Sequence, residues 1–353
     1  MAFERKADHI DICLNEDVKA RRNYWDDVHI VHSALPEINM DDIDMSVTLF
    51  GRKLAAPIIL AAITGGFEGA GNINRNLAQA AAKVGVGFGV GSQRPALADE
   101  KLAASYEVVK EFDVPLVIGN VGAPQLIDQK GKKAFGVEEC KRAVEMVGAH
   151  ILAIHMNYLQ EIVQPEGDLN AKGCLSAIGK IAKQMPVLAK ETGAGLSRPV
   201  AQQLMKAGVA GLDVGGHGGT SFSAVEYYRA KAGGDETLTR IGETFWDWGI
   251  PTPVSIVTAD VGLPIVATGG LSSGLDVARA VSLGASSGGL AGHMLAAAKD
   301  SAEAVEKELN ILISELKGAM FLCGASSVEE LMDVPVVVTG LTADWLSAME
   351  PVE

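Results

Sequence analysis

The strongest constraint on the fold is a repeating pattern of short apolar runs, each ending in glycine, a small residue or a polar group. Segments with helical periodicity separate the runs, for example NINRNLAQAAAKV and GVEECKRAVEMV. Short continuous apolar strands that alternate with helices indicate parallel pairing through right-handed crossovers. The runs lie at 57–66, 85–94, 115–123, 150–157, 186–193, 210–219, 264–270 and 286–292. Eight such units predict an α/β fold of the (β/α)8, or TIM-barrel, type.

A doubly wound sheet is the alternative, but it would gather polar motifs at one or two strand ends. Here nearly every run ends in a candidate ligand-binding group, as the catalytic face of a barrel requires. We expect one domain over 1–353, with an N-terminal extension (1–50), the barrel (57–317) and a C-terminal extension (318–353). The segment 221–263 is long for a single crossover, which predicts an excursion over the barrel mouth.

Charge and composition narrow the class of function. The formal net charge is −14, so the surface repels nucleic acid and anionic membranes, and an anionic ligand needs a local cationic pocket. The charged start MAFERKADHI predicts no signal peptide, and no apolar run approaches the roughly 18 residues of a membrane span. The four cysteines form no C-x-x-C pair, which predicts reduced thiols in a cytoplasmic protein.

The last two runs carry glycine turns that suit a phosphate. ATGGLSSGLDVARA contains Gly269, Gly270 and Leu271, and GGLAGH contains Ala291 and Gly292. In barrels, backbone N–H groups after the last two strands commonly hold a phosphate. Tight turns without a ligand remain the alternative.

Other strand ends suit a planar cofactor. Lys190 closes an apolar run in AKETGAG, where it could face an electron-rich ring or simply pair with Glu191. Thr220 follows the glycines of GGHGGTS, while Asn120 and Thr64 supply hydrogen-bonding groups from two further runs. Together with the phosphate turns, these groups predict a polar-edged ring system with a phosphate tail, and flavin mononucleotide (FMN) fits that description.

Two basic clusters predict a second anion site. ERKADHI places Arg5, Lys6 and His9 within five residues, and on a helix Arg5 and His9 would share a face. GSQRP adds Ser92, Gln93 and Arg94 at the end of the second run. A solvated basic tip is the alternative for the N-terminal cluster, and it weakens because the second run offers another arginine.

The run HILAIHMNYLQE ends in polar groups that suit a diphosphate. His155 and Asn157 point the same way on a strand, and Gln160 and Glu161 follow in the loop. Glu161 would repel a polyanion unless a divalent cation lay between them. Mg²⁺ favours such a site, with few carboxylates plus phosphate oxygens and water.

These motifs together resemble one family. RKADHI, the TGG after the first run, GSQR, GNVGA, HMNYLQE, the lysine of AKETG, GGHGGTS, and GG followed by AG occur in the order of the type 2, FMN-dependent isopentenyl-diphosphate isomerases, between residues 5 and 292. The resemblance implies an enzyme of isoprenoid biosynthesis that interconverts isopentenyl and dimethylallyl diphosphate. It also implies reduced FMN as acid and base, Mg²⁺ on the diphosphate, NADPH as reductant, and a homotetramer or homo-octamer.

The resemblance also assigns residues to roles. It implies flavin contacts at Ala62, Ile63, Thr64, Ser92, Asn120, Lys190, Thr220, Gly269, Gly270, Leu271, Ala291 and Gly292. It implies substrate contacts at Arg5, Lys6, His9, Ser92, Gln93, Arg94, His155, Asn157 and Gln160. Gln160, His155 and Lys190 would serve catalysis, and Glu161 would hold Mg²⁺.

Three positions depart from the family, and two other functions stay open. Ile63 stands where methionine is frequent, Ser272 where arginine is frequent, and His293 is unusual. An FMN-dependent 2-hydroxy-acid oxidase or dehydrogenase would use His217 as its base, but the next residues lack the arginine that such chemistry needs. A non-enzymatic flavin-binding protein would leave the HMN…QE cluster unexplained.

Overall fold

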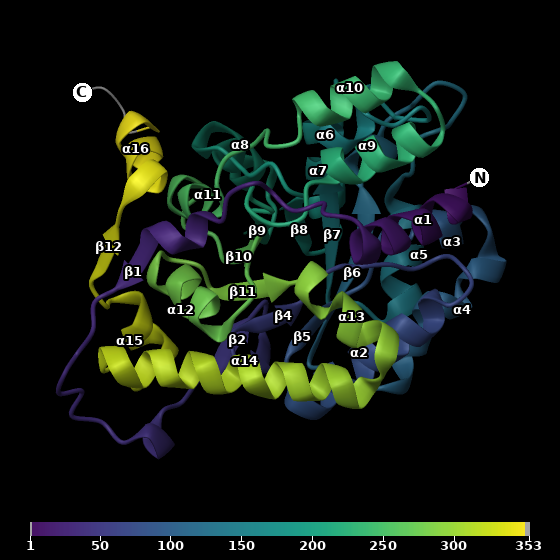
Figure 1. The fold of residues 1–353 in the computed structure, drawn as a ribbon. Helices are drawn as coiled ribbons and strands as arrows, with labels where there is room; N and C mark the ends of the chain where they lie inside the picture. The colour runs from purple at the N-terminus through teal and green to yellow at the C-terminus, as the bar shows by residue number, and fades with distance from the viewer. Residues whose placement is uncertain (1, 350–353) are drawn as a thin grey trace.

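The computed structural model describes residues 2–349, with side chains described from Lys6 onward. Eight parallel strands close into a barrel, as the sequence predicted (Figure 1). Each strand pairs with the next along the chain, and the last pairs back with the first through Gly288 and Ile58. The barrel strands are β4 (Ile58–Leu60), β5 (Gly87–Gly89), β6 (Leu116–Gly122), β7 (Ile151–Met156), β8 (Val187–Glu191), β9 (Gly211–Asp213), β10 (Ile265–Thr268) and β11 (Ser287–Leu290).

Helices cover the outside of the barrel and connect successive strands (Figure 1). Up to β9 they are α2 (Ala70–Val84), α3 (Arg94–Ala98), α4 (Ala104–Glu107), α5 (Val137–Val147), α6 (Tyr158–Glu161), α7 (Cys174–Ala182) and α8 (Arg198–Ala207). After β9 come α9 (Phe222–Ala232), α10 (Glu236–Thr244), α11 (Thr252–Thr258), α12 (Gly274–Ser282), α13 (Leu295–Asp300) and α14 (Ala302–Cys323). The segment 221–263 thus contains three helices, and α14 runs past residue 318, where we expected the barrel to have ended.

Alternate residues of each strand belong to two separate cores, because a strand points successive side chains to opposite faces. Ile58 and Leu60 pack outward against the helices, whereas Ile59 packs inside the barrel. The inner core also contains Ile151 and Ala153 of β7. Both faces of every strand are therefore buried, which explains the continuous apolar runs.

A hairpin closes the amino end of the barrel. The strands β2 (Val47–Leu49) and β3 (Arg52–Leu54) pair antiparallel, and Leu49 and Leu54 join the inner core. Phe50 and Gly51 form the turn with φ of 50° and 74°, and a side chain at Gly211 would collide with the Phe50 ring. This plug leaves the carboxyl end as the open end for a site.

Strands from the first and last parts of the chain pair on one side of the barrel. After α1 (Ala2–Asn15), the strand β1 (Val28–Ile30) pairs antiparallel with β12 (Val336–Val338) (Figure 1). The helices α15 (Val328–Met332) and α16 (Gly340–Met349) flank β12. Across residues 2–349, no helix has the length and apolarity that a bilayer span requires.

Candidate active site

The inward-facing positions of five strands place polar side chains in one layer at the open end. Ile118, Ile151, Leu188 and Val266 belong to the inner core, and two or four residues further along each strand the inward positions are polar. Gly211, which faces the Phe50 plug, leads in the same way to a polar position on β9. The resulting layer consists of Asn120, His155, Lys190, Asp213 and Thr268. Strand alternation alone therefore gathers these groups around the barrel axis.

Asn120 orients the ring of His155. The amide nitrogen of Asn120 donates to the carbonyl of Val90 at 3.0 Å, so its oxygen faces His155 Nδ1 at 2.7 Å. That oxygen accepts a hydrogen bond, which assigns a proton to Nδ1. His155 and Asn120 were both predicted site residues, and the structure brings them into direct contact.

His155 stays neutral near pH 7. Burial lowers its pKa to about 3, and the charges of Lys190, Lys6 and Arg94 add to the shift, while a hydrogen bond to the Val121 backbone opposes it. Three cations therefore lie around the ring. An anion that neutralised them would favour protonation of His155.

Asn157 and Gln160 form a connected amide pair beyond β7. The amide nitrogen of Asn157 donates to Glu161 Oε1 at 2.9 Å and to Gln160 Oε1 at 3.2 Å. Gln160 donates to Glu226 Oε1 at 2.8 Å. The oxygen of Asn157 is buried and, within residues 2–349, accepts no hydrogen bond. A ligand could satisfy this oxygen.

Glu226 is a site residue that the sequence reasoning missed. It lies on α9 and is buried, and its Oε1 is 2.9 Å from Nε2 of His9 on α1. Burial opposes its ionisation, but the hydrogen bond with His9 and the charge of Arg229 outweigh that effect and hold the pKa of Glu226 below its usual range. The excursion after β9 thus reaches the barrel mouth, as predicted. A lone glutamate on a helix gave no sequence signal for this role.

Lys6 anchors α1 in the barrel mouth. Its Nζ lies 2.6 Å from the carbonyl oxygen of Gly65, 2.7 Å from that of Ser92 and 3.0 Å from the hydroxyl of Tyr106. The N-terminal basic cluster thus lies on a helix, and Lys6 of that helix contacts Ser92 of the GSQR motif. The side chain of Arg5 lies outside the described residues.

The two neighbours in GSQR have different surroundings. Arg94 donates through Nη1 to Asp168 at 2.9 Å and is partly exposed. Gln93 is fully buried, donating to the carbonyl of Ala143 at 2.8 Å and accepting from the Asn120 N–H at 2.8 Å. A substrate contact through Gln93 would require these bonds to break. Arg94 remains the basic group of this motif that faces the site.

Lys190 pairs with Asp213, so the alternative pairing with Glu191 was wrong. Lys190 Nζ lies 2.8 Å from Asp213 Oδ2 and donates to Thr268 at 3.1 Å. Adjacent strand residues face opposite sides, and Glu191 therefore cannot share the inward layer. Asp213 and Thr268 were missed, although the inward register of their strands could have identified them.

Glu191 instead organises the loop after β8. Its Oε2 accepts from the backbone N–H groups of residues 192 to 195 at 2.5 to 3.1 Å. Burial raises the pKa of Glu191 to about 7, although these four hydrogen bonds lower it. The loop holds the outer side of the glycine segment 215–219, because a Cβ on Gly215 would collide with the Glu191 backbone.

A small cavity sits between the inward layer and the barrel core. Its walls include Ala62, Asn120, Lys190, Asp213 and Val266. Three of these five residues were predicted to contact a flavin. The neighbouring predicted residues Ile63 and Thr64 follow β4, and the Thr64 carbonyl accepts from the Gly91 N–H at 3.0 Å.

The last strand ends form a compact glycine cradle. Gly269 and Gly270 have φ of 117° and 80°, and a Cβ on Gly219 would lie 2.5 Å from the Gly270 nitrogen. The indole of Trp25 donates to the Gly269 carbonyl at 3.1 Å, which fixes the orientation of this turn. A Cβ on Gly292 would lie 3.0 Å from the Thr220 hydroxyl. The predicted residues Leu271 and Ala291 adjoin the same turns, so the structure brings this predicted set together.

His217 is buried away from the inward layer. It is 3% exposed, packs edge-on against Tyr24 and lies 3.6 Å from Asp247. Burial lowers its pKa. These surroundings do not suit a base that must reach a substrate, and the 2-hydroxy-acid oxidase alternative loses its candidate residue.

Comparisons with known proteins identify a matching family and a matching fold. The family model described as FMN-dependent dehydrogenase matches residues 5–107 and 167–337. A mandelate oxidase variant with a monooxide FMN adduct superimposes with a TM-score of 0.62, covering 95% of this chain and 92% of that chain at 20% identity, a likeness that shows the fold alone.

Two relatives with much higher sequence identity are both isopentenyl-diphosphate delta-isomerases. The isopentenyl-diphosphate delta-isomerase of Thermoplasma volcanium is 46% identical over 346 residues, which cover 98% of this chain and 99% of that protein. The isopentenyl-diphosphate delta-isomerase of Archaeoglobus fulgidus is 47% identical over 346 residues, covering 97% and 98%. The chain therefore belongs to the FMN-dependent isopentenyl-diphosphate delta-isomerase family.

Proposed function

We propose that the chain interconverts isopentenyl and dimethylallyl diphosphate by adding one proton and removing another. The observation that carries the proposal is the cluster of Asn157, Gln160 and Glu161 after β7. On one side of it lie the cations Lys6 and Arg94, and on the other lies the inward layer with His155 and Lys190. A charged diphosphate head and an apolar alkene need such a divided site.

FMN fits the second region. Lys190 lines the cavity beside Ala62 and Asn120 and donates to Thr268, the residue before the glycine cradle. In the cradle, side chains larger than hydrogen would collide with neighbouring backbone. Backbone N–H groups at Gly269, Gly270, Leu271, Ala291 and Gly292 would hold the phosphate. Ile63, Thr64, Ser92, Asn120 and Thr220 would line the ring and its chain. When bound in its reduced form, the flavin would supply acid–base and electrostatic chemistry to the alkene.

Mg²⁺ fits beside Glu161. This carboxylate is buried and accepts from Asn157 and from the Asp168 N–H, which fixes both its oxygens. Within the described chain, no group of three or more histidine, cysteine, aspartate or glutamate side chains could hold a metal by itself. A single fixed carboxylate suits an ion that takes its other ligands from phosphate and water.

The protein groups around the alkene position would orient it and handle protons. Gln160 is neutral and is no strong base, but Glu226 fixes its amide and could exchange a proton through it or through water. His155 would bind the diphosphate end, which would also neutralise the nearby cations Lys6 and Arg94. Lys190, held by Asp213 and Thr268, would stabilise negative charge on the flavin edge.

Three further parts of the proposal concern context. NADPH would reduce the flavin, the location would be cytoplasmic, and the protein would assemble as a homotetramer or homo-octamer. Size-exclusion chromatography with light scattering tests the assembly. Stopped-flow bleaching of the flavin by NADPH tests the reductant.

One experiment tests the proposed reaction. Purified protein is loaded with FMN, reduced anaerobically with dithionite and given isopentenyl diphosphate with Mg²⁺. Dimethylallyl diphosphate should form, and it should not form with oxidised flavin or without the metal. Mandelate and lactate should leave the oxidised flavin spectrum unchanged. Bleaching by either acid without any isomerisation would replace the isomerase proposal with the oxidase alternative.

A further inference from the structure

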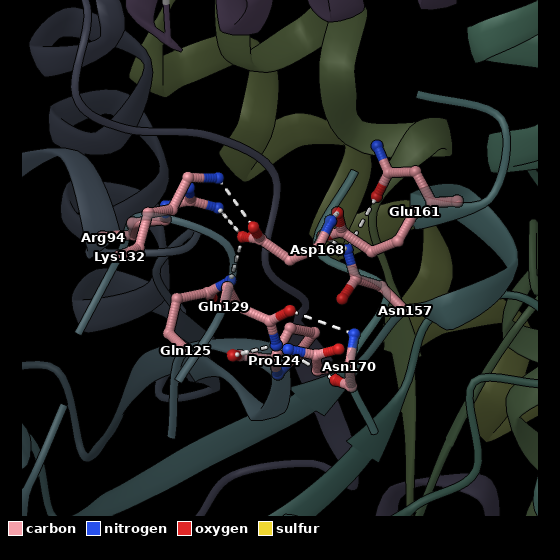
Figure 2. A network of polar contacts seen from close by, with 10 residues as sticks. Arg94, Pro124, Gln125, Gln129, Lys132, Asn157, Glu161, Asp168 and Asn170 are labelled. Carbon is pink, nitrogen blue, oxygen red and sulfur yellow. Dashed lines mark hydrogen bonds and ion pairs between the residues drawn. The ribbon is translucent and has the colours of Figure 1, made fainter. Parts of the chain in front are cut away.

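Asp168 lies at the centre of a polar network beside the anion pocket (Figure 2). It belongs to the loop between α6 and α7 and is only 3% exposed. Its Oδ2 accepts from Arg94 at 2.9 Å, and its Oδ1 accepts from Lys132 Nζ at 2.6 Å. Figure 2 shows the two cations side by side, approaching the carboxylate from the same direction.

The same residue also reaches the proposed metal ligand. Its backbone N–H donates to Glu161 Oε2 at 2.7 Å, and Gln125 adds a weaker contact to its carboxylate at 3.4 Å. Asp168 therefore connects the pocket's cations to Glu161. Among the sequence motifs, neither Asp168 nor Lys132 was singled out.

The loop that carries Lys132 is held in place. Gln129 and Lys132 exchange two backbone hydrogen bonds, both of 3.0 Å. The side chain of Gln129 donates to the carbonyls of Pro124 and Asn170 at 2.9 and 3.0 Å, and accepts from the Asn170 N–H at 3.0 Å (Figure 2). These hydrogen bonds tie the turn to the segment that contains Asp168. They therefore fix the position of the Lys132 backbone relative to Asp168.

Burial of the Asp168 carboxylate favours keeping both ion pairs. A buried carboxylate that lost both cations would keep an uncompensated charge, which costs far more than an exposed pair gains. The cations are less buried than Asp168, with side-chain exposures of 23% for Arg94 and 45% for Lys132. Each also has further N–H groups with which to bind an anion.

We propose that Asp168 is a positioning residue that holds Arg94 and Lys132 as a fixed pair, and that Lys132 is a further cation for the diphosphate. This inference rests on the proposed function. A rigid pair loses less side-chain freedom when the diphosphate binds than two free side chains would. The hydrogen bond from the Asp168 N–H to Glu161 would keep the two cations at a fixed position relative to the proposed Mg²⁺ site.

A competing role for Asp168 would change substrate affinity in the opposite direction. If Asp168 only occupied the cations until substrate displaced it, removing its charge would strengthen substrate binding. If it positions them, removing its charge weakens binding. The sign of the change in KM therefore separates the two accounts.

The test compares Asp168→Asn with Asp27→Asn. Asp27 is a matched control, because it is buried, pairs with Arg22 at 2.9 Å and accepts from Thr342, but it lies beside the β1–β12 pair. Asp168→Asn should raise the KM for isopentenyl diphosphate on the order of tenfold, as is typical when an orienting partner is lost. kcat should change little, and FMN should remain bound. Asp27→Asn should leave KM unchanged.

One variant keeps the inference testable if Asp168→Asn folds poorly, and a double variant sharpens the test if it folds. Lys132→Gln alters a half-exposed side chain and should raise KM several-fold, on the order expected for one phosphate contact. In an Arg94→Ala background, Asp168→Asn should add less than its separate effect, because it acts partly through that arginine.

The outcomes separate this inference from the proposed function. Wild-type protein without isomerase activity would remove the proposed function and this inference with it. An active wild type whose KM is unchanged or lowered in Asp168→Asn, or unchanged in Lys132→Gln, would overturn the inference alone.

Discussion

The two halves of the candidate site are built by different means. On the side of β5 and β7, charged side chains from distant segments converge, as when Lys6 reaches two backbone carbonyls and Arg94 meets Asp168. On the side of β9 to β11, the backbone itself forms the cradle, with Gly219 against Gly270. Lys190 and Asp213 form the buried ion pair at the boundary.

This difference suits the ligands that we propose. A cofactor that stays bound can be held by rigid backbone with little side-chain motion. A substrate that enters and leaves at every turnover is better served by partly exposed cations, which steer it and release it. Mutations on the two sides should therefore separate cofactor retention from substrate affinity.

The largest effect should come from the boundary pair. Lys190→Met leaves Asp213 buried without its cation, and breaking such a pair typically costs about 3–5 kcal/mol. Urea unfolding measures the loss. The double variant Lys190→Met/Asp213→Asn removes the stranded charge and should recover much of the stability. Equal stability of the single and double variants would contradict the pairing.

The cations of the substrate side should control affinity. Arg94→Ala and Lys6→Ala should each cost about 1.5–3 kcal/mol of substrate binding, since that is typical of charge-assisted hydrogen bonds. Steady-state kinetics should show the loss in KM, and FMN absorbance should stay constant. Variants that release FMN but keep a normal KM would reverse our assignment of the two sides.

Neutral His155 makes stability depend on pH. Burial lowers its pKa to about 3 in the folded protein, against the ordinary histidine value of 6.5, so over this pH range the unfolded chain binds a proton that the folded chain does not. The contribution of this group to the free energy of unfolding is fully present above its unfolded pKa of 6.5 and decreases as the pH drops toward 3. Between pH 7 and pH 5 the decrease should be about 2 kcal/mol. Urea unfolding of wild type and His155→Gln at both pH values should show a smaller loss in the variant.

The glycine cradle can be tested with a pair matched in backbone conformation. Gly270 and Gly262 have φ of 80° and 81°, but only at Gly270 would a Cβ meet neighbouring atoms, 2.5 Å from the Gly218 carbonyl. The left-handed backbone should cost each alanine variant about 1–2 kcal/mol, and the collision should cost Gly270→Ala additional stability. Only Gly270→Ala should also lose FMN, as measured by flavin absorbance after gel filtration. FMN retention in both would show that close approach at Gly270 is unimportant.

The smallest effect should be on the metal. Glu161→Gln keeps the size of the side chain but removes its charge and replaces one of its two acceptor oxygens with an NH₂ group. The Mg²⁺ concentration for half-maximal activity should rise about tenfold, with FMN retained. A titration identical to wild type would dissociate Glu161 from the metal.

The sequence predicted those features that local pattern determines. The eight strands and the end of β7 follow from apolar runs and strand alternation, and the glycine turns follow from residue type. The hairpin plug was missed, because LFGRKL reads as part of an extension until the barrel supplies its partners.

Partners across long sequence distances could not be predicted in the same way. Asp168 lies 74 residues from Arg94, and Glu226 lies 66 residues from Gln160. Only the closed barrel brings them together, and no local spacing encodes such pairs. Lys190 and Glu191 illustrate the opposite case. They are neighbours in sequence, but they face opposite sides of a strand and therefore do not pair.

The number of turnovers per electron pair tests the central claim most directly. Isopentenyl and dimethylallyl diphosphate have the same oxidation level, so an acid–base cycle consumes no reductant. After one anaerobic two-electron reduction of bound FMN, many molecules of substrate should isomerise in D₂O, with deuterium entering the carbon that was the alkene terminus. One electron pair consumed per product, or product without deuterium, would contradict the account.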